Sequence, residues 1–132
     1  TEKGDEFKKF CTYDGMGFQL LQTTGVKVGI LTSEDKDLNR RRAQKIGLDF
    51  DFHGAKDKLQ IVIDLCKKEN ITLEEVAYIG DDINCFGLLS NVGIAACPAN
   101  AVQKIKLIPN IIQLEKKGGE GVVREFVELI ID

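Results

Sequence analysis

Clustered metal-binding residues are what this 132-residue sequence lacks most clearly. It contains one histidine, His53, and four cysteines, none of which form a C-x-x-C pair. Zinc sites are built from grouped thiols and imidazoles, so this composition argues against one. We interpret the scattered cysteines as reduced thiols of a core, as in the cytoplasm; they are Cys11, Cys66, Cys85 and Cys97.

Long apolar runs and an excess of positive charge are also missing. No apolar stretch approaches membrane-spanning length, and no signal-like start is visible. The 18 Lys and Arg residues against 21 Asp and Glu give a net charge of −3, which provides no basic patch for nucleic acid or an anionic membrane. We therefore expect a cytoplasmic, single-domain protein without nucleic-acid or membrane partners.

Strand-like and helix-like segments alternate along the chain. The predicted strands are residues 26–32 (VKVGILT), 48–54 (LDFDFHG), 76–80 (VAYIG) and 93–97 (GIAAC). The predicted helices are residues 38–47, 55–70 and the end of the segment 118–132, and Thr72 with Glu75 fits a capping box. Apolar strands alternating with helices predict an α/β fold with a parallel sheet covered on both faces.

Polar residues follow these predicted strands. Thr32 ends the first strand and Ser33 and Glu34 follow it, His53 lies at the end of the second and Lys58 follows it, and Asp81 and Asp82 follow the third. Carboxyl ends of parallel strands meet at one edge, so we expect the side chains of Thr32, Lys58 and Asp81 to share one cleft. Carboxylates bind Mg²⁺, while a hydroxyl and a lysine bind phosphate oxygens. Taken singly, Thr32 and Asp82 are better explained as helix caps and Lys58 as a solvated charge, and only together do they favour this chemistry.

Three of these motifs carry a family resemblance. GILTSE (29–34), GAKDKL (54–59) and VAYIGDDIN (76–84) resemble motifs two, three and four of the haloacid dehalogenase superfamily. HGAKDK, YIGDDIN and KKGGEGVVREF resemble its capless tetrameric phosphatases acting on sugar-acid phosphates, which include 3-deoxy-octulosonate 8-phosphate and nonulosonate 9-phosphate phosphatases. The resemblance implies a Mg²⁺-dependent phosphoric monoester hydrolase. It also implies a three-layer Rossmann-like parallel sheet of haloacid dehalogenase type, with no cap domain, over residues 1–132.

The resemblance assigns a role to each matching residue. It implies that Thr32 binds the phosphoryl group and that Lys58 stabilises the nucleophile and the transferring phosphoryl. Asp81 would be a Mg²⁺ ligand, and Asp82 would support the metal site.

Substrate contacts are expected from Thr32, Ser33, Glu34 and Lys45. Glu34 stands where octulosonate phosphatases typically have arginine, and together with Lys45 it resembles the nonulosonate pattern. We therefore favour a nonulosonate 9-phosphate over an octulosonate 8-phosphate. A solvated Lys45 beside the arginines at 40–42 remains an open alternative.

The family takes its nucleophile and general acid from a DxDG motif at the end of its first strand. CTYDGMG (11–17) has Thr12 two residues before Asp14, and residues 10–21 resemble the family's later DG-x-G segment instead. We therefore expect the sequence to be N-terminally incomplete, to lack the catalytic strand and to be inactive as given. VKVGILT and VAYIG should then not pair directly but lie two strand spacings, roughly 9–10 Å, apart.

One departure leaves a second function open. The fourth motif usually reads GDD-x-x-D, whereas here Cys85 takes the last position, and a thiol does not replace a carboxylate for hard Mg²⁺. The alternative is a non-catalytic, phosphatase-like tetramerisation domain of an acylneuraminate cytidylyltransferase. The resemblance implies a homotetramer, with the Gly-Gly segment before the last helix at a subunit boundary.

Overall fold

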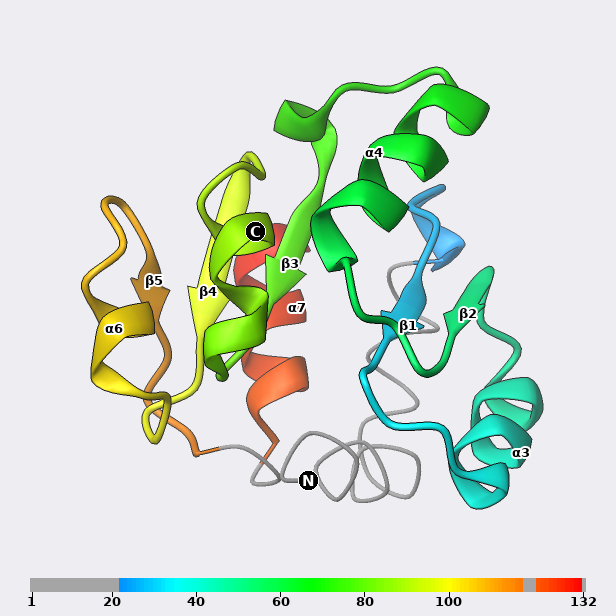
Figure 1. Cartoon of the computed structure of the whole chain (residues 1–132), viewed down its shortest axis with the longest axis horizontal. Coiled ribbons are helices and arrows are strands. Elements are labelled where there is room, and N and C mark those ends of the chain that lie inside the picture. Colours follow the sequence, from blue (N-terminus) through cyan, green and yellow to red (C-terminus); the bar gives the residue numbers. More distant parts are fainter. Residues whose placement is uncertain (1–21, 118–120, 132) are drawn as a thin grey trace. The chain divides into compact units, whose positions relative to one another are not determined.

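The computed structural model describes residues 22–117 and 121–131 (Figure 1). These residues belong to two compact units. The first contains residues 22–55 and 121–131 of the described part, and the second is Lys56–Lys117. That residues 1–132 form a single domain stays a prediction. The segment at 10–21 and the thiol of Cys11 lie outside the described residues.

The first unit contains a two-stranded parallel sheet with helices before and after β2 in the chain. Its elements are β1 (Gly29–Leu31), α3 (Asp37–Ile46), β2 (Phe50–Phe52) and α7 (Val122–Ile131). In the β1–β2 pair Gly29 lies opposite Phe50, and a Cβ on Gly29 would lie 2.5 Å from Phe50 Cβ. A side chain at this position would therefore force the strands apart. α3 ends where the sequence predicts, because Gly47 has a φ of 79°, which favours glycine.

Asp49 ties the entry of β2 to the segment before β1. Its carboxylate accepts hydrogen bonds from the Val28 N–H at 2.7 Å and from Gln22 Nε2 at 3.1 Å. The bond from the Val28 amide, followed by that from Gln22, lowers the pKa of Asp49 below its ordinary value. The charged form of this carboxyl group therefore stabilises the first unit.

The second unit contains a three-stranded parallel sheet in the order β3-β4-β5. Its elements are α4 (Lys58–Glu69), η1 (Leu73–Glu75), β3 (Ala77–Ile79), η2 (Ile83–Cys85), α5 (Phe86–Leu89), β4 (Ile94–Cys97), α6 (Gln103–Lys106) and β5 (Ile112–Gln113). The three strands lie side by side with α6 beside β5 (Figure 1). β4 is the central strand, and its last residues, Ala96 and Cys97, are fully buried.

Local signals set the ends of α4 and η1. Asp57 Oδ1 accepts a hydrogen bond from the Gln60 N–H at 3.2 Å and so caps the start of α4. Asn70 ends the helix in the left-handed conformation. The predicted capping box is present, with the Thr72 N–H donating to Glu75 Oε1 at 3.0 Å, but it opens a short 3-10 turn rather than an α-helix.

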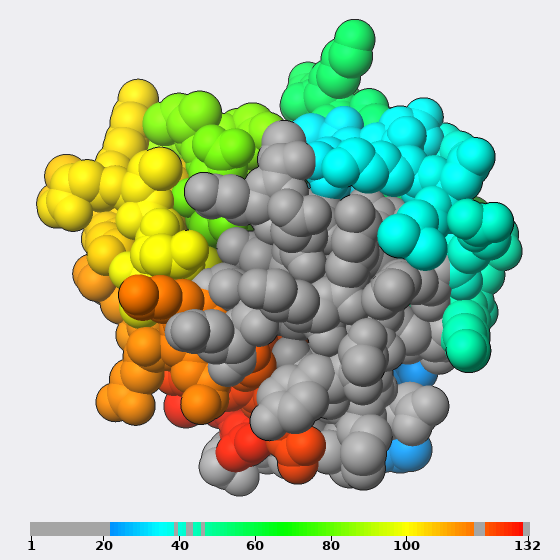
Figure 2. All heavy atoms as spheres, turned by 90° about the horizontal axis from the view of Figure 1, so that it is seen from below, coloured from blue at the N-terminus to red at the C-terminus, as the bar shows by residue number. Residues whose placement is uncertain are grey.

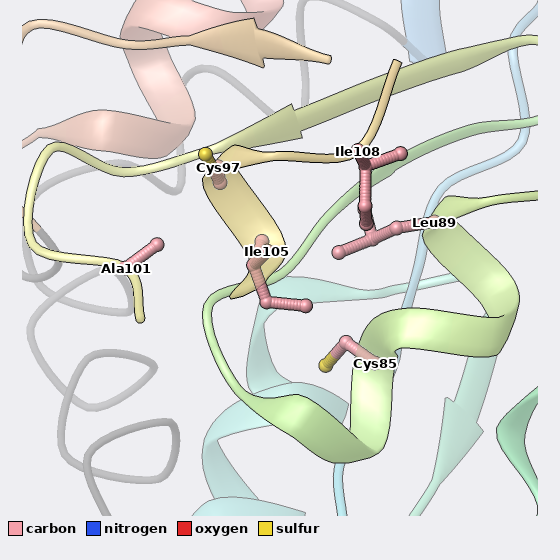
Figure 3. Close-up of a cluster of buried hydrophobic side chains, with 6 residues drawn as sticks. All are labelled: Cys85, Leu89, Cys97, Ala101, Ile105 and Ile108. Atoms are coloured by element: carbon pink, nitrogen blue, oxygen red, sulfur yellow. The ribbon is translucent and has the colours of Figure 1, made fainter. Parts of the chain in front are cut away.

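Buried side chains from η2, α5, the end of β4, α6 and the residues on either side of α6 form a hydrophobic cluster in the second unit (Figure 3). They are Cys85, Leu89, Cys97, Ala101, Ile105 and Ile108. The cysteines that the structure describes, Cys66, Cys85 and Cys97, are buried thiols, which agrees with the prediction of core thiols. Burial raises the pKa of Cys66 and of Cys97, so these two thiols stay protonated near neutral pH.

The observed strands are shorter than the predicted ones. β3 has Ala77 exposed and Tyr78 half-buried, so the expectation of a buried strand at 76–80 was wrong. The physical reason is that, among the described residues, β3 pairs with β4 on one side only. β1 and β3 belong to different sheets, which agrees with the expectation that they do not pair directly. The spacing between them stays a prediction.

Candidate functional site

Burial singles out three polar residues. In the part of the chain that the structure describes, the polar or charged residues that are buried are Thr32, Lys58 and Asp81, with 1%, 2% and 5% of their surfaces exposed. Burying a charge costs free energy unless hydrogen bonds or a ligand compensate. These are the residues that the sequence selected for phosphoryl transfer.

Thr32 follows β1 in the first unit and is fixed by the backbone. Its N–H donates to the Phe52 carbonyl at 3.0 Å, and its own carbonyl accepts from the Ala55 N–H at 2.9 Å. Its hydroxyl oxygen accepts a hydrogen bond from the Glu34 N–H at 3.2 Å. A hydroxyl that accepts in this way can still donate its hydrogen, which suits a phosphate oxygen.

The predicted substrate-binding residues lie in this same unit. Glu34 has only 8% of its side chain exposed, and its Oε2 lies 3.5 Å from Lys36 Nζ. Ser33 is exposed next to it. Lys45 is exposed in the last turn of α3, and α3 reaches the molecular surface in Figure 2. A lysine at a helix C-terminus is favoured by the helix dipole, so the solvated interpretation of Lys45 remains open.

Lys58 is the first residue of α4 in the second unit. Its Nζ lies 3.6 Å from Cys85 Sγ, inside the unit rather than in solvent. The interpretation of Lys58 as a solvated charge is therefore wrong. A positive charge in the first turn of a helix is opposed by the dipole, so burial of Lys58 is unfavourable for α4 by itself.

Asp81 and Asp82 follow β3 but occupy different environments. The Asp81 carbonyl accepts from the Val102 N–H at 3.2 Å, and its side-chain Oδ2 is buried with no hydrogen-bond partner in the described part of the chain. Asp82 is exposed, and its Oδ1 accepts from the Ile83 N–H at 2.6 Å at the start of η2. Asp82 is thus a helix cap, while Asp81 presents an oxygen that lacks a partner.

Cys85 has several polar neighbours in the second unit. Besides Lys58, Tyr78 Oη lies 3.7 Å from its sulfur. A Cβ on Gly80 would lie 2.9 Å from Cys85 Sγ and 3.0 Å from the Tyr78 ring, so only glycine fits there. The sequence marked Cys85 as a departure from the family pattern, but it did not predict this contact with Lys58.

The donor set of the second unit suits a metal ion only in part. Among the described residues, no group of three His, Cys, Asp or Glu side chains is placed to hold a metal. The buried, unpartnered Oδ2 of Asp81 nevertheless fits one carboxylate ligand of a hard cation. We conclude that Asp81 can supply one ligand of a Mg²⁺ site but cannot form that site alone.

Sequence reasoning noted His53 at the end of its strand but missed its pairing with Asp51. His53 Nε2 contacts Asp51 Oδ1, and His53 Nδ1 is buried without a partner among the described residues. The signal was present in the alternating FDFH segment, because residues two apart in a strand share one face.

A model of the haloacid dehalogenase-like hydrolases matches residues 10–88. The 3-deoxy-D-manno-octulosonate 8-phosphate phosphatase of Yersinia pestis is 34% identical over 130 residues, which cover 98% of this chain and 68% of that protein. The corresponding phosphatase of Haemophilus influenzae is 30% identical and covers 97% of this chain and 71% of its own length. The chain thus spans about two thirds of these relatives.

Solved structures agree with these sequence matches. The phosphatase of Moraxella catarrhalis, in complex with a magnesium ion, a phosphate ion and a KDO molecule, aligns with a TM-score of 0.85 and 33% identity over 89% of this chain and 67% of its own. The cobalt-bound form of the Haemophilus influenzae enzyme aligns with a TM-score of 0.84 and 30% identity, over 89% of this chain and 68% of its own. With the parallel sheets and flanking helices, these matches confirm the predicted resemblance and fold class. Within residues 22–117 and 121–131, none of the helices has the length and apolar composition of a membrane span.

Proposed function

The chain belongs to the haloacid dehalogenase-like hydrolase family, and from this membership we propose a specific reaction for it. The enzyme class, a phosphoric monoester hydrolase, is the one that the sequence predicted. We propose that the protein hydrolyses the phosphate monoester of a 2-keto-3-deoxy sugar acid with Mg²⁺. In this proposal the nucleophile, which becomes an aspartyl phosphate, is an Asp that lies outside residues 1–132. The main structural support for this proposal is the burial of Thr32, Lys58 and Asp81.

Thr32 and Lys58 are proposed to act on the phosphoryl group. The Thr32 hydroxyl, held by the Glu34 N–H, donates its hydrogen to a phosphoryl oxygen. The Lys58 ammonium offsets the negative charge of the nucleophile and of the transferring group, and its burial keeps it from being screened by water.

Asp81 is proposed as the Mg²⁺ ligand, and Asp82 as a supporting residue. Mg²⁺ supplies charge stabilisation to the phosphoryl oxygens when it is bound. The buried Oδ2 of Asp81 supports this assignment because it has no hydrogen-bond partner among the described residues. Cys85 is excluded as a ligand by its soft sulfur.

The substrate class rests on the relatives and on Glu34. Both curated relatives described above act on an eight-carbon sugar-acid phosphate, and the Moraxella structure contains the sugar acid itself. We propose that Glu34, with Ser33 and Lys45 as further contacts, changes the preference to a nine-carbon acid. The Glu34 side chain is almost buried and paired with Lys36, so its carboxylate has a defined position.

The test is phosphate release by the intact protein, which includes the segment carrying the nucleophile. We expect Mg²⁺-dependent hydrolysis with a higher kcat/KM for the nine-carbon than for the eight-carbon substrate. Glu34→Arg should reverse this preference by about tenfold. Glu74→Arg, an exposed change in η1, is the matched control and should leave the preference unchanged.

Cys85 favours one second candidate, the non-catalytic tetramerisation domain of an acylneuraminate cytidylyltransferase. A homotetramer is proposed for either function, and light scattering of the intact protein should give four times the subunit mass. Phosphate release would exclude the second candidate. A tetramer that releases no phosphate from either substrate would establish it in place of the phosphatase.

A further inference from the structure

The single histidine of the chain is oriented by a carboxylate. His53 Nε2 contacts Asp51 Oδ1, and the side chain of His53 is only 4% exposed whereas that of Asp51 is 29% exposed. A carboxylate can only accept a hydrogen bond, so it holds the hydrogen of the neutral imidazole on Nε2. His53 Nδ1 then carries a lone pair and is an acceptor.

This acceptor has no partner in the described part of the chain. His53 Nδ1 is buried and makes no hydrogen bond there. Leaving a buried polar atom unsatisfied costs about 1–3 kcal/mol, so such atoms in native proteins require an explanation. A ligand that donates a hydrogen bond to Nδ1 would remove this cost.

His53 lies beside the proposed phosphate-binding loop. It follows β2 directly, and β2 pairs in parallel with β1, which Thr32 follows. Backbone hydrogen bonds join the two loops, from the Gly54 N–H to the Glu34 carbonyl and from the Ala55 N–H to the Thr32 carbonyl, both at 2.9 Å. The turn is fixed further by Gly54, whose φ of 69° favours glycine. The histidine and the phosphate-binding hydroxyl are therefore held at one edge of one sheet.

We propose that His53 is a specificity-determining residue whose Nδ1 accepts a hydrogen bond from a hydroxyl group of the sugar-acid part of the substrate. Asp51 is its positioning residue, because it fixes the tautomer that leaves Nδ1 as an acceptor. The proposal rests on the function proposed above, since only a polyhydroxylated substrate offers such a donor. The phosphate group, which has no hydroxyl of this kind to offer when it is ionised, is not the ligand of His53.

Kinetics of the intact protein provide the first test. His53→Leu should lower kcat/KM for the sugar-acid phosphate by about tenfold. The kcat/KM for p-nitrophenyl phosphate, which lacks the hydroxyls, should change less than about twofold. His53→Gln retains an acceptor and should recover part of the loss. If wild type prefers the sugar-acid phosphate and His53→Leu keeps that preference, the role of His53 is overturned. If wild type hydrolyses neither compound, the proposed function itself has failed.

The second test measures the NMR signals of the His53 ring nitrogens and does not depend on enzyme activity. With ¹⁵N-histidine labelling of the intact protein, the ring signals of His53 are assigned as those that disappear in His53→Gln. A phosphate-free 3-deoxy-2-keto sugar acid should move the unprotonated Nδ1 signal, and inorganic phosphate should not. Equal shifts with both compounds, no shift with either, or a protonated Nδ1 in the resting protein would each overturn the proposal.

The positioning role of Asp51 has its own spectroscopic signature. In Asp51→Asn the amide can donate to Nε2, so the ring hydrogen should move to Nδ1 and the sugar-acid shift should be lost. The matched control is Asp64→Asn, an exposed change on α4 where Oδ1 accepts from Gln60 Nε2. Thermal unfolding of each variant verifies folding. An unchanged tautomer in folded Asp51→Asn would contradict the role of Asp51.

Discussion

The ammonium nitrogen of Lys58 lies 3.6 Å from the sulfur of Cys85, and both residues are almost fully buried. In the fourth motif, this thiol stands at the position where the family usually has a carboxylate. A thiol is a weak acceptor without a formal charge, whereas a carboxylate would form a charge-assisted hydrogen bond. This contact therefore neutralises Lys58 less than a carboxylate would.

Lys58 should be indispensable because its charge acts on the transferring group. Lys58→Met keeps an unbranched side chain of similar length, and we expect kcat of the intact protein to fall about a thousandfold or more. The control is Lys56→Met, an exposed lysine two residues earlier, which should retain activity. Steady-state kinetics measure both variants. Near-wild-type kcat in Lys58→Met would remove Lys58 from the mechanism.

Cys85→Asp should improve the intact enzyme at limiting Mg²⁺. A carboxylate beside Lys58 supplies a charged acceptor, and groups that orient a metal site typically change affinity about 10- to 100-fold. We expect phosphate release at low Mg²⁺ to rise about tenfold, while Cys85→Ala should lower stability by about 1 kcal/mol through lost packing. Lower activity of folded Cys85→Asp would mean that the thiol is required.

Substitutions of the two acids after β3 should have different effects, one on Mg²⁺ affinity and the other on stability. Asp81→Asn removes the charge from the buried, unpartnered oxygen, and we expect Mg²⁺ affinity of the intact protein to fall at least about a hundredfold. Asp82→Ala removes the oxygen that accepts from the Ile83 N–H and should mainly weaken the cap of η2, by about 1 kcal/mol. Calorimetry measures the first effect and thermal unfolding the second. Equal Mg²⁺ affinities of Asp81→Asn and wild type would exclude Asp81 as a ligand.

The depressed pKa of Asp49 predicts a pH-dependent contribution to stability. Above the ordinary pKa of 3.8 the charged carboxylate accepts from the Val28 N–H, and this contribution is lost as pH falls through the lowered pKa of the folded state. Asp49→Asn should cost about 1 kcal/mol at pH 7, since the group is exposed, and less as the pH falls below 3.8. Denaturant unfolding at several pH values tests this, and a constant difference would contradict it.

The sequence predicted the site best where polar side chains come directly after a strand. Thr32, Lys58 and Asp81 were selected because parallel strands present their carboxyl ends at one edge, and the structure buries all three. The periodic segment of α4 and the stop at Gly47 were also predicted correctly. Whether the three side chains share one cleft stays a prediction.

Short elements and paired side chains were harder to predict. α5 and α6 have four residues each and β5 has two, too few for periodicity to appear. The burial of Lys58 depends on neighbours that come together only in the folded unit, so its place in the first turn of a helix, taken alone, favoured a solvated charge. The contact of Lys58 with Cys85 spans 27 positions, which local sequence patterns do not reveal.

The space around Gly80 restricts which substitutions can be accepted beside Lys58. A Cβ at this position would collide with Cys85 Sγ at 2.9 Å and with the Tyr78 ring at 3.0 Å. Any larger residue would therefore displace the sulfur that contacts Lys58, and not only the strand end. Positions 78, 80 and 85 are thus epistatic: the added Cβ would also lie 2.9 Å from Cys85 Cβ and 3.0 Å from the Tyr78 ring, so shrinking Cys85 to alanine makes no room for it, and a lineage that keeps these neighbours must keep the glycine.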